Sequence, residues 1–335
     1  MTRTILVTGG AGYIGSRLIR DLAGDPAFDD CLIRIYDNLQ RDTCRSLLDL
    51  PAQGRYQFVE GDILDSTGLG LAMRDVWAVV HMAAIVRTPL AFGPSGWIEQ
   101  VNHWGSATVG RAAAEAGVAH LIYTSSAAVY GPVDAVAGAP TSAPHPFDEG
   151  AICRPLGPYA ESKLRGEREL QALQAAGRLR VTVLRLGSVF GWAPAVRFDA
   201  VANRLAYLAG VRRPLTVYGA GEQRRPLLHV ADASHAVRFA LAHAEQVAGG
   251  LYNVVGENAR VLDVAAALRA LQPATQVHFT EQDVLTHLSL AVSGDRLNGL
   301  GWYPQVSLEA GLAELLDHLR GFVPFGAETW QEEGA

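Results

Sequence analysis

The chain has 335 residues, of which 49% are hydrophobic and 19% charged, so wholesale disorder is excluded and one large or two ordinary domains are expected. Its formal charge of −6, from 34 acidic and 28 basic residues, gives no basic excess that would favour nucleic acid or an anionic membrane. The three cysteines, Cys31, Cys44 and Cys153, lack metal-ligand spacing and fit a reducing compartment, and no apolar run suffices for a membrane span. We therefore expect a cytoplasmic protein without a bound metal.

Short apolar strands alternate with helical patterns through the first half of the chain. Strands are predicted at Thr4–Thr8, Cys31–Tyr36, Tyr56–Val59, Ala78–His81, Leu121–Thr124 and Val181–Leu186. Helices are predicted at Tyr13–Leu22, Trp97–Ala116 and Tyr159–Ala176. This alternation predicts an α/β fold, a doubly wound parallel sheet of the Rossmann type covered by helices on both faces.

The pattern loosens after Gly191. We expect residues 1–190 to form a dinucleotide-binding domain that carries the catalytic residues. Residues 191–325 would be mainly a smaller substrate-binding lobe, with some segments returning to the sheet, and residues 326–335 a frayed tail. Helices are predicted at Arg197–Leu208, Asp232–His243 and Leu262–Ala270, and Pro132–Pro146 is predicted to be a long loop.

A glycine-rich turn joins the first strand to the first helix. Gly9, Gly12 and Gly15 fit the spacing GxxGxxG, and Gly10 with the last two also fits GxGxxG. Glycines there let the backbone approach a pyrophosphate, and the helix that opens at Tyr13-Ile14 supplies free N–H groups and a favourable dipole. The alternative is an ordinary tight βα turn.

Asp37 follows the second strand, 22 residues after Gly15. A carboxylate there would bind the adenosine ribose hydroxyls and repel a 2′-phosphate, which favours NAD over NADP. A solvent-exposed aspartate is the alternative. Asp62, after the third strand, is expected either near the adenine or as a helix cap.

Tyr159 and Lys163 stand four residues apart at the start of a predicted helix and so share a face. An ammonium near a phenol favours the phenolate, so Tyr159 could act as a base below its ordinary pKa of about 10. Ser125 and Ser126 end a strand that should point at the nicotinamide, where a hydroxyl can hydrogen-bond the reacting oxygen. A surface Tyr–Lys pair and simple turn chemistry are the alternatives.

These motifs together resemble the extended short-chain dehydrogenases/reductases, in the group of NAD-dependent sugar epimerases and dehydratases. The resemblance runs from the glycine turn to Leu300-Gly301-Trp302-Tyr303-Pro304. It implies Ser126 as the catalytic hydroxyl, Tyr159 as the base, and Lys163 as a residue that also holds the nicotinamide ribose. Further cofactor contacts are implied at Asn38, Asp62, Ile63, Ala83, Ala84 and Asn102.

The loop after the catalytic hydroxyl departs from part of the family. Sugar 4,6-dehydratases resemble one another in an Asp-Glu pair that eliminates water, and these positions are Ala127 and Ala128 here. The 3,5-epimerases carry a cysteine in this loop, whereas Cys153 lies elsewhere. What remains is oxidation and reduction at one carbon. The resemblance therefore implies an NAD-dependent 4-epimerase of a UDP-hexose, acting through a 4-keto intermediate.

The substrate residues are less typical. Ser188 stands where many relatives have an asparagine, and Arg225 matches the family's diphosphate arginine. A second arginine is usual before the final Leu-Gly-Trp, and Arg296 is the candidate, although the alignment there is open. A diphosphate favours bidentate arginine contacts. Arg204, Arg212 or Arg213 could instead rebuild the phosphate site, so a nucleotide sugar is expected but not required.

Two alternatives to the epimerase stay open: a dehydrogenase or ketoreductase that releases its cofactor, and a non-catalytic NAD-binding sensor. The helices at Trp97–Ala116 and Tyr159–Ala176 would pair two subunits into a homodimer, as in relatives. The charged run that includes Glu161, Arg165 and Glu167 suggests a solvent-exposed helix face.

Overall fold

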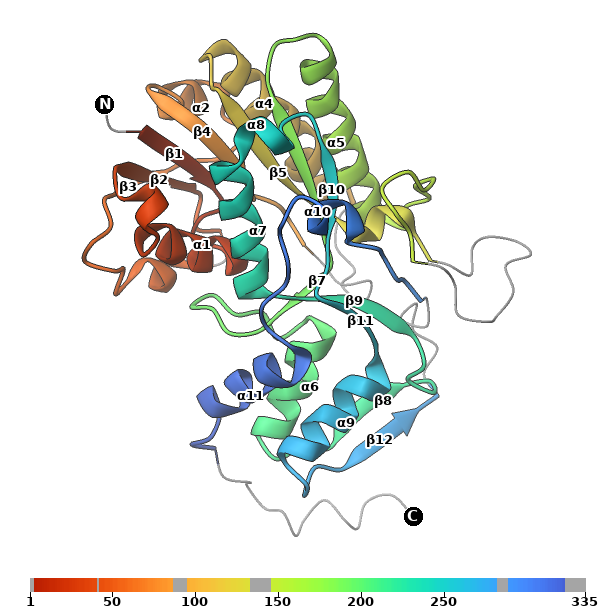
Figure 1. Cartoon of the computed structure of the whole chain (residues 1–335). Coiled ribbons are helices and arrows are strands. Elements are labelled where there is room, and N and C mark those ends of the chain that lie inside the picture. The colour runs from red at the N-terminus through yellow and green to blue at the C-terminus, as the bar shows by residue number, and fades with distance from the viewer. Residues whose placement is uncertain (1–2, 41, 87–94, 133–145, 282–288, 323–335) are drawn as a thin grey trace.

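The structure, a computed structural model, describes residues 3–40, 42–86, 95–132, 146–281 and 289–322. It consists of an α/β domain, at the top of Figure 1, and a smaller lobe below it. The predicted tail at 326–335 and nearly all of the predicted loop Pro132–Pro146 lie outside the described residues.

A parallel sheet forms the centre of the larger domain. Within the described chain it has seven strands, in the order β10-β6-β5-β4-β1-β2-β3. Their bounds are β1 Arg3–Thr8, β2 Cys31–Asp37, β3 Tyr56–Glu60, β4 Val76–His81, β5 His120–Ser126, β6 Val181–Leu186 and β10 Leu251–Val254. Every neighbouring pair is parallel, so the predicted doubly wound sheet is confirmed. The strand order reverses between β1 and β4, which places the ligand crevice at the carboxyl ends of these two strands.

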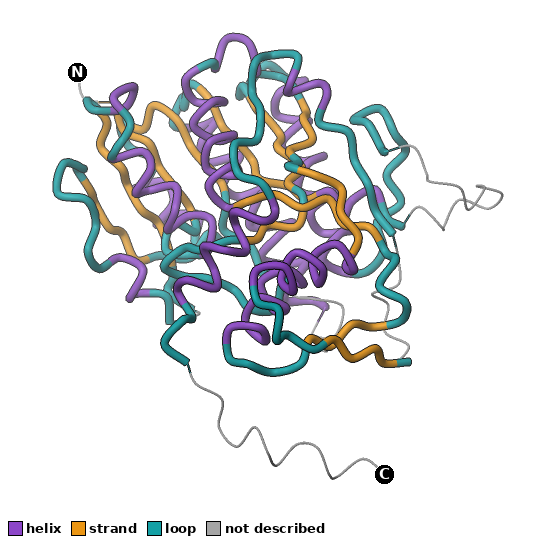
Figure 2. Tube along the Cα trace, turned by 60° about the horizontal axis from the view of Figure 1, so that its bottom comes forward, coloured by secondary structure: helices purple, strands orange, loops and turns teal. Residues whose placement is uncertain are grey.

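Helices cover both faces of the sheet (Figures 1 and 2). Side chains alternate along β1: Ile5 and Val7 belong to the core shared with α1 and α7, and Leu6 belongs to the core shared with α2, α4 and α5. The helices of this domain are α1 Tyr13–Ala23, α2 Ser66–Ala72, α3 Ser95–Glu99, the π-helical turn η3 Gln100–Trp104, α4 Gly105–Glu115, α5 Pro158–Ala175, α7 Val230–Ala242 and α8 Ala244–Val247; short 3₁₀ turns are η1 Pro26–Phe28, η2 Cys44–Leu47 and η4 Ala127–Tyr130.

The smaller lobe has its own apolar core, formed between α6, α9 and α11 and the strands beside them. Its described strands make a three-stranded sheet in the order β11-β9-β7 and a separate pair, β12-β8. The elements are β7 Ser188–Phe190, α6 Val201–Gly210, β8 Leu215–Tyr218, β9 Arg224–His229, β11 Glu257–Arg260, α9 Val261–Leu271, β12 Val277–Thr280 and α11 Leu308–His318. The short helix α10, Asp295–Asn298, packs instead on β10 of the large sheet.

The chain returns to the large sheet after it has entered the lobe. Helix α7 packs beside α1, and β10 pairs with β6 through Leu251 and Val183 to form the outermost strand. The larger domain is therefore built from separate stretches of sequence, the last of which contains α10 and Trp302.

Two predicted helices differ in detail from the structure. Helix α6 begins at Val201 rather than Arg197, because Arg197 pairs with Asp199 and donates to the Val86 carbonyl at 3.2 Å, which holds this stretch outside the helix. The helix predicted over Trp97–Ala116 contains the π-helical turn η3, which carries Asn102. Such turns are often found at functional sites.

Candidate active site

The glycine turn is packed too closely for side chains. Gly9 has φ +73°, and a Cβ there would lie 2.7 Å from the Ala83 backbone nitrogen. A Cβ on Gly15 would lie 2.3 Å from the Gly9 carbonyl oxygen. Gly12 caps α1 without any side-chain hydrogen bond. The first amides of α1, from Tyr13 and Ile14 onward, are therefore available to an anionic group such as a pyrophosphate.

Asp37 ends β2 and is bound to the glycine turn. Its carboxylate accepts hydrogen bonds from the amides of Ala11 at 3.0 Å and Leu39 at 2.9 Å. Burial raises the pKa of Asp37, and the two amide bonds act in the opposite direction. The residue is half-buried beside the turn and stabilises its shape through these two bonds. From this position its carboxylate could also bind a ribose.

Asn38 and Asp62 lie together at the carboxyl ends of β2 and β3. The Asn38 Nδ2 atom donates to Asp62 Oδ2 at 3.0 Å, and Asp62 Oδ1 accepts from the Leu64 amide at 2.9 Å. Asp62 thus caps its own turn after β3. Ile63 is buried, and a Cβ on Gly105 of α4 would meet its side chain at 2.5 Å.

Asn102 acts on the loop after β4. Its side chain accepts from the Ile85 amide at 2.7 Å and donates to the Ile85 carbonyl at 2.9 Å. The same Nδ2 donates to Ser162 Oγ at 3.1 Å, whose hydroxyl donates to the Tyr159 carbonyl at 2.9 Å. Because Asn102 is fully buried, it aligns the loop that carries Ala83-Ala84 with the helix that carries Tyr159.

The three predicted catalytic residues come together at the carboxyl end of β5. Ser126 is the last residue of β5, and its Oγ accepts from the Ala128 amide at 3.2 Å, which caps η4. Its hydroxyl lies close enough to the Tyr159 phenol to lower the pKa of that phenol. Lys163 is one turn further along α5, buried, with Nζ 4.5 Å from the centre of the Tyr123 ring. Lys163 is the only lysine of the chain.

The pKa shifts differ from the sequence-based expectation. Burial raises the pKa of Tyr159, although the Ser126 hydrogen bond and the charge of Arg197 both lower it. Burial lowers the pKa of Lys163 to about 7, and the Glu167 carboxylate opposes that shift. Lys163 does not lower the Tyr159 pKa below its ordinary value in the protein alone, because desolvation is the larger effect at both residues.

Glu167 corrects the prediction of a solvent-exposed helix face. It is 1% exposed, and its carboxylate binds the guanidinium of Arg185 on β6 at 3.0 and 2.7 Å. Ser125, which precedes Ser126, donates to the same carboxylate. The helical spacing of Glu167 from Lys163 was the available sequence signal, because residues four apart lie on one face.

Ser188 and Arg225 lie on neighbouring strands of the lobe sheet, whereas Arg296 lies elsewhere. Ser188 on β7 is opposite Leu227 on β9, and Arg225 is two residues before Leu227. Both side chains therefore emerge on the same face of neighbouring strands. The exposed Arg296 instead has its guanidinium 5.2 Å from the centre of the Tyr252 ring, on the edge strand β10. Its expected role beside Arg225 is not supported by this position.

Comparison with known proteins identifies the family. The sequence profile of the NAD dependent epimerase/dehydratase family matches residues 5–255, which include the glycine turn and the Ser126, Tyr159 and Lys163 cluster. The chain belongs to this family. Its members are NAD-dependent enzymes of the oxidoreductase and isomerase kind, and the resemblance stated from the motifs is confirmed.

Relatives of this epimerase/dehydratase family member match over nearly the whole chain. A UDP-glucose 4-epimerase from Azospirillum brasilense is 32% identical over 326 residues, covering 90% of this chain and 87% of the relative. A dTDP-D-glucose 4,6-dehydratase from Mus musculus is 30% identical over 333 residues, covering 95% and 89%. Both activities therefore occur among its relatives.

Solved structures show the same fold with NAD bound. DesIV, a dTDP-glucose 4,6-dehydratase from Streptomyces venezuelae with NAD bound, matches with a TM-score of 0.82 and 26% identity, covering 95% of this chain and 97% of that one. MoeE5 in complex with UDP-glucuronic acid and NAD matches with a TM-score of 0.80 and 25% identity, covering 95% and 99%. NAD is the cofactor of the family, and the tight glycine turn and Asp37 fit it.

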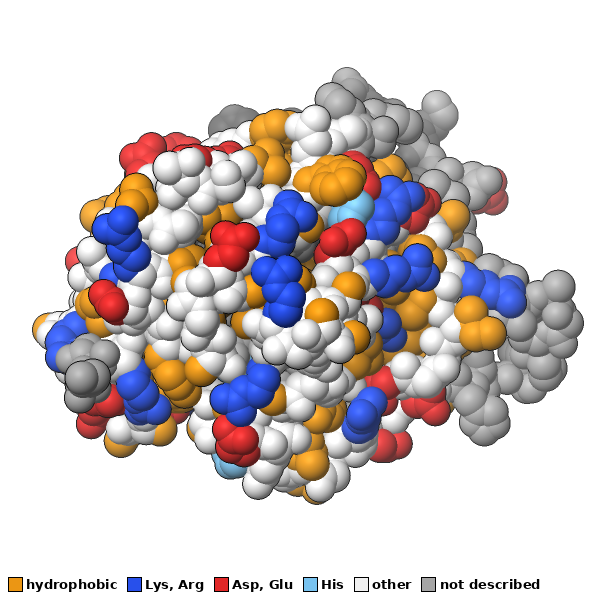
Figure 3. Space-filling view, turned by 90° about the horizontal axis from the view of Figure 1, so that it is seen from above, with side chains coloured by type: hydrophobic (Ala, Val, Ile, Leu, Met, Phe, Trp, Pro, Cys, Tyr) orange, Lys and Arg blue, Asp and Glu red, His pale blue; other side chains and the backbone are white. Residues whose placement is uncertain are grey.

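Other classes of site receive no support from the residues that the structure describes. No group of three or more His, Cys, Asp or Glu side chains there could hold a metal ion. No helix in these ranges is long and apolar enough to cross a bilayer. On the face shown in Figure 3, basic and acidic side chains are interspersed rather than gathered into a patch of one sign.

Proposed function

We propose that the protein is an NAD-dependent nucleotide-sugar epimerase that acts at C4 of a UDP-hexose through a transient 4-keto intermediate. The observation that carries this proposal is the turn η4. It follows Ser126 immediately, and where the family's dehydratases have an acid pair it has Ala127 and Ala128. Neither side chain can donate or accept a proton, so elimination of water has no acid or base in this turn.

The remaining groups suit oxidation and reduction at one carbon. Tyr159 accepts the proton of the sugar hydroxyl, and Ser126 hydrogen-bonds the same oxygen while it becomes a carbonyl. The buried ammonium of Lys163 favours the phenolate form of Tyr159 during this step. Bound NAD supplies the acceptor for the hydride and afterwards its donor. Tyr159 would give its proton back to the sugar oxygen when the hydride returns to the opposite face of the 4-keto sugar, which would complete the epimerisation.

The direct test is incubation of the purified protein with UDP-glucose and with UDP-galactose, followed by separation of the two sugars. We expect each to yield the other without net NADH, and Tyr159→Phe to abolish the exchange. A parallel incubation with dTDP-glucose should give no 4-keto-6-deoxy product. Failure to interconvert these UDP-hexoses or their N-acetyl forms would contradict the 4-epimerase.

One observation favours a second candidate, a dehydrogenase or ketoreductase of the same fold. Arg296 lies on α10 with its guanidinium over Tyr252 of the edge strand β10, whereas Arg225 lies on β9 of the lobe sheet. A substrate without a diphosphate would need no second arginine. Stoichiometric NADH formation during oxidation of an alcohol would support this candidate. A non-catalytic sensor is disfavoured, because it has no need of a phenol, hydroxyl and buried ammonium in one cluster.

We further propose that two copies of the chain associate through the helices α3 to α5. Trp97 on α3 and Trp104 at the end of η3 are 36% and 51% exposed. Large exposed apolar side chains of this kind are typical of subunit contacts. Light scattering should report a dimer, and Trp104→Lys should yield a monomer.

A further inference from the structure

A segment between the two domains is bonded to loops on both sides of the ligand crevice. This crossing segment, Gly191 to Asp199, leads from β7 to α6. The Gly191 carbonyl accepts a hydrogen bond from the Tyr13 phenol at 2.6 Å, and Arg197 Nη2 donates to the Val86 carbonyl at 3.2 Å. Tyr13 follows β1 and Val86 follows β4. The crossing segment therefore spans the point at which the strand order reverses.

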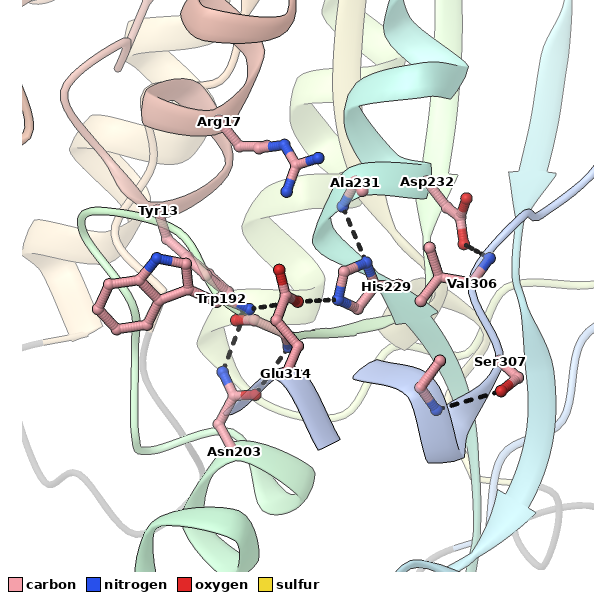
Figure 4. Close-up of polar contacts among 12 residues, drawn as sticks. Tyr13, Arg17, Trp192, Asn203, His229, Ala231, Asp232, Val306, Ser307 and Glu314 are labelled. Atoms are coloured by element: carbon pink, nitrogen blue, oxygen red, sulfur yellow. Dashed lines mark hydrogen bonds and ion pairs between the residues drawn. The ribbon is translucent and has the colours of Figure 1, made fainter. Parts of the chain in front are cut away.

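Asn203 joins both ends of the crossing segment to Tyr13, and Figure 4 shows it beside Tyr13 and Trp192. Its Nδ2 donates to the Arg197 carbonyl at 2.8 Å and to the Tyr13 phenol at 3.1 Å. Its Oδ1 accepts from the Gly191 amide at 2.9 Å. Asn203 lies on α6 and is fully buried, so no solvent competes for these bonds.

The start of the crossing segment is also fixed from the lobe. Gly191 has φ +105°, and a Cβ there would lie 2.1 Å from His229 Nε2. His229 Nδ1 accepts from the Ala231 amide, so its Nε2 donates to Glu314, at 3.0 Å. Glu314 in turn accepts from the Trp192 amide at 3.5 Å (Figure 4). The segment thus has one well-defined path.

The other end of the crossing segment reaches the catalytic cluster. The charge of Arg197 lowers the pKa of both the Tyr13 and the Tyr159 phenols, against the larger effect of burial. The guanidinium is held by Asp199 and the Val86 carbonyl. The segment therefore runs from the glycine turn to the loop after β4.

We propose that Asn203 is a positioning residue that holds the crossing segment over bound NAD and thereby slows release of the cofactor. A dinucleotide in this fold lies across the carboxyl ends of the strands at the switch point. The crossing segment is bonded to the loops that border that place. NAD can leave only after one of these attachments opens. The inference rests on NAD binding, not on the identity of the sugar.

The test is the rate at which NADH leaves the full-length protein, measured by fluorescence after mixing with excess NAD. Tyr13→Phe removes a hydroxyl that makes two hydrogen bonds and should raise the dissociation rate by at least about two- to tenfold, the range expected for one such bond. Asn203→Leu removes three bonds at similar volume and should raise it further. The association rate should change little. The Tyr13→Phe/Asn203→Leu double variant should increase the dissociation rate by less than the product of the two single increases, because both residues lie in one network.

Two matched variants separate this role from a general loss of stability. Tyr56→Phe removes a phenol that donates to the Pro51 carbonyl at 3.1 Å, and Asn258→Leu removes an amide that binds both backbone groups of Val292. Both should leave NADH dissociation at the wild-type rate. Equal rates in the Tyr13 and control variants would overturn the proposal. So would an unchanged dissociation rate combined with a raised sugar KM. If Asn203→Leu does not fold, Tyr13→Phe alone decides.

Discussion

The Glu167 carboxylate binds the Arg185 guanidinium through two hydrogen bonds, Nε–Oε1 at 3.0 Å and Nη2–Oε2 at 2.7 Å, and both side chains are buried. This pairing satisfies the charge of Arg185. Lys163, one turn earlier on α5, is buried without an ion pair to any carboxylate among the residues that the structure describes. Burial accordingly lowers the pKa of Lys163 to about 7. The other titratable groups around it are His81, Tyr123 and Tyr159. None of them carries a negative charge at neutral pH, because burial lowers the pKa of His81 and raises the pKa of both tyrosines.

Glu167→Gln should lower both the stability of the protein and the pKa of Lys163. Loss of one partner of a buried ion pair typically costs about 3–5 kcal/mol, because Arg185 remains buried without its carboxylate. The pKa of Lys163 should fall below its wild-type value, because Glu167 raises it. Protein labelled with ¹³C-lysine gives one lysine signal to titrate by NMR. A Glu167→Leu/Arg185→Met double variant should recover stability but not the Lys163 pKa, and an unshifted titration would contradict the assignment.

Lys163→Met should change how stability depends on pH. The pKa of Lys163 is about 7 in the folded protein and 10.5 in the unfolded chain, so between these values the unfolded chain binds more protons. The free energy of unfolding therefore rises with pH across this window, by at most about 1.4 kcal/mol per pH unit from this group. We expect the variant to be more stable than wild type at pH 7 and the difference to shrink towards pH 10. Urea unfolding at several pH values measures this, and parallel curves would disprove it.

Tyr159→Phe should remove most turnover, about 10²–10⁴-fold, while NAD still binds. The phenol transfers a proton, whereas the glycine turn and Asp37 hold the dinucleotide. Ser126→Ala should be milder, because it removes one hydrogen bond to the reacting oxygen and Thr124 or Ser125 lies nearby. Steady-state rates with NAD titrations test this order. A Tyr159→Phe enzyme with wild-type kcat would refute the mechanism.

Asp37→Ala should weaken NAD binding and narrow the preference over NADP. The change removes the ribose acceptor and also the acceptor of the Ala11 amide, so the glycine turn loosens as well. Asp37→Asn keeps a side-chain oxygen for that amide and should lose less affinity for NAD. Isothermal titration with both cofactors makes the comparison. Wild-type protein that binds NADP as tightly as NAD would show the ribose assignment to be incorrect.

Arg225→Ala should raise the KM for a nucleotide sugar with little effect on NAD. A charge-assisted hydrogen bond contributes about 1.5–3 kcal/mol, which corresponds to roughly ten- to hundredfold in KM. Arg224→Ala is the matched control, because adjacent residues of β9 point to opposite faces and Arg224 donates to the Asn258 carbonyl at 3.3 Å. Equal KM values for the two variants would place Arg225 outside the substrate site.

The sequence predicted the large sheet well because its strands leave strong local signals. Most of them are short apolar runs. The glycine motif between the first strand and the first helix marks a strand–turn–helix unit. The strands of the lobe are three to six residues long and include Arg224 and Arg225, so no local period marks them. Their pairing depends on contacts between segments more than 30 residues apart, such as Ser188 with Leu227.

Polar residues inside the protein were the hardest to interpret from sequence. Glu167 stands among the half-exposed Glu161 and Arg165, and composition alone favoured an exposed face. Its burial follows from tertiary packing, since Arg185 of β6 lies beneath α5. Asn203 likewise has no motif, because its three partners come from different parts of the chain.

The late position of the outermost strand β10 in the sequence has a consequence for the protein during its synthesis. Strand β6 has left the ribosome about 65 residues before β10, the strand that protects its edge. Until Val254 has emerged, the backbone of Val183 and Leu184 presents unpaired hydrogen-bonding groups, a template for pairing with another chain. Fragments that stop at residue 190 would keep this edge open permanently. The nascent chain therefore passes through an aggregation-prone stage that ends only when three quarters of it has been synthesised.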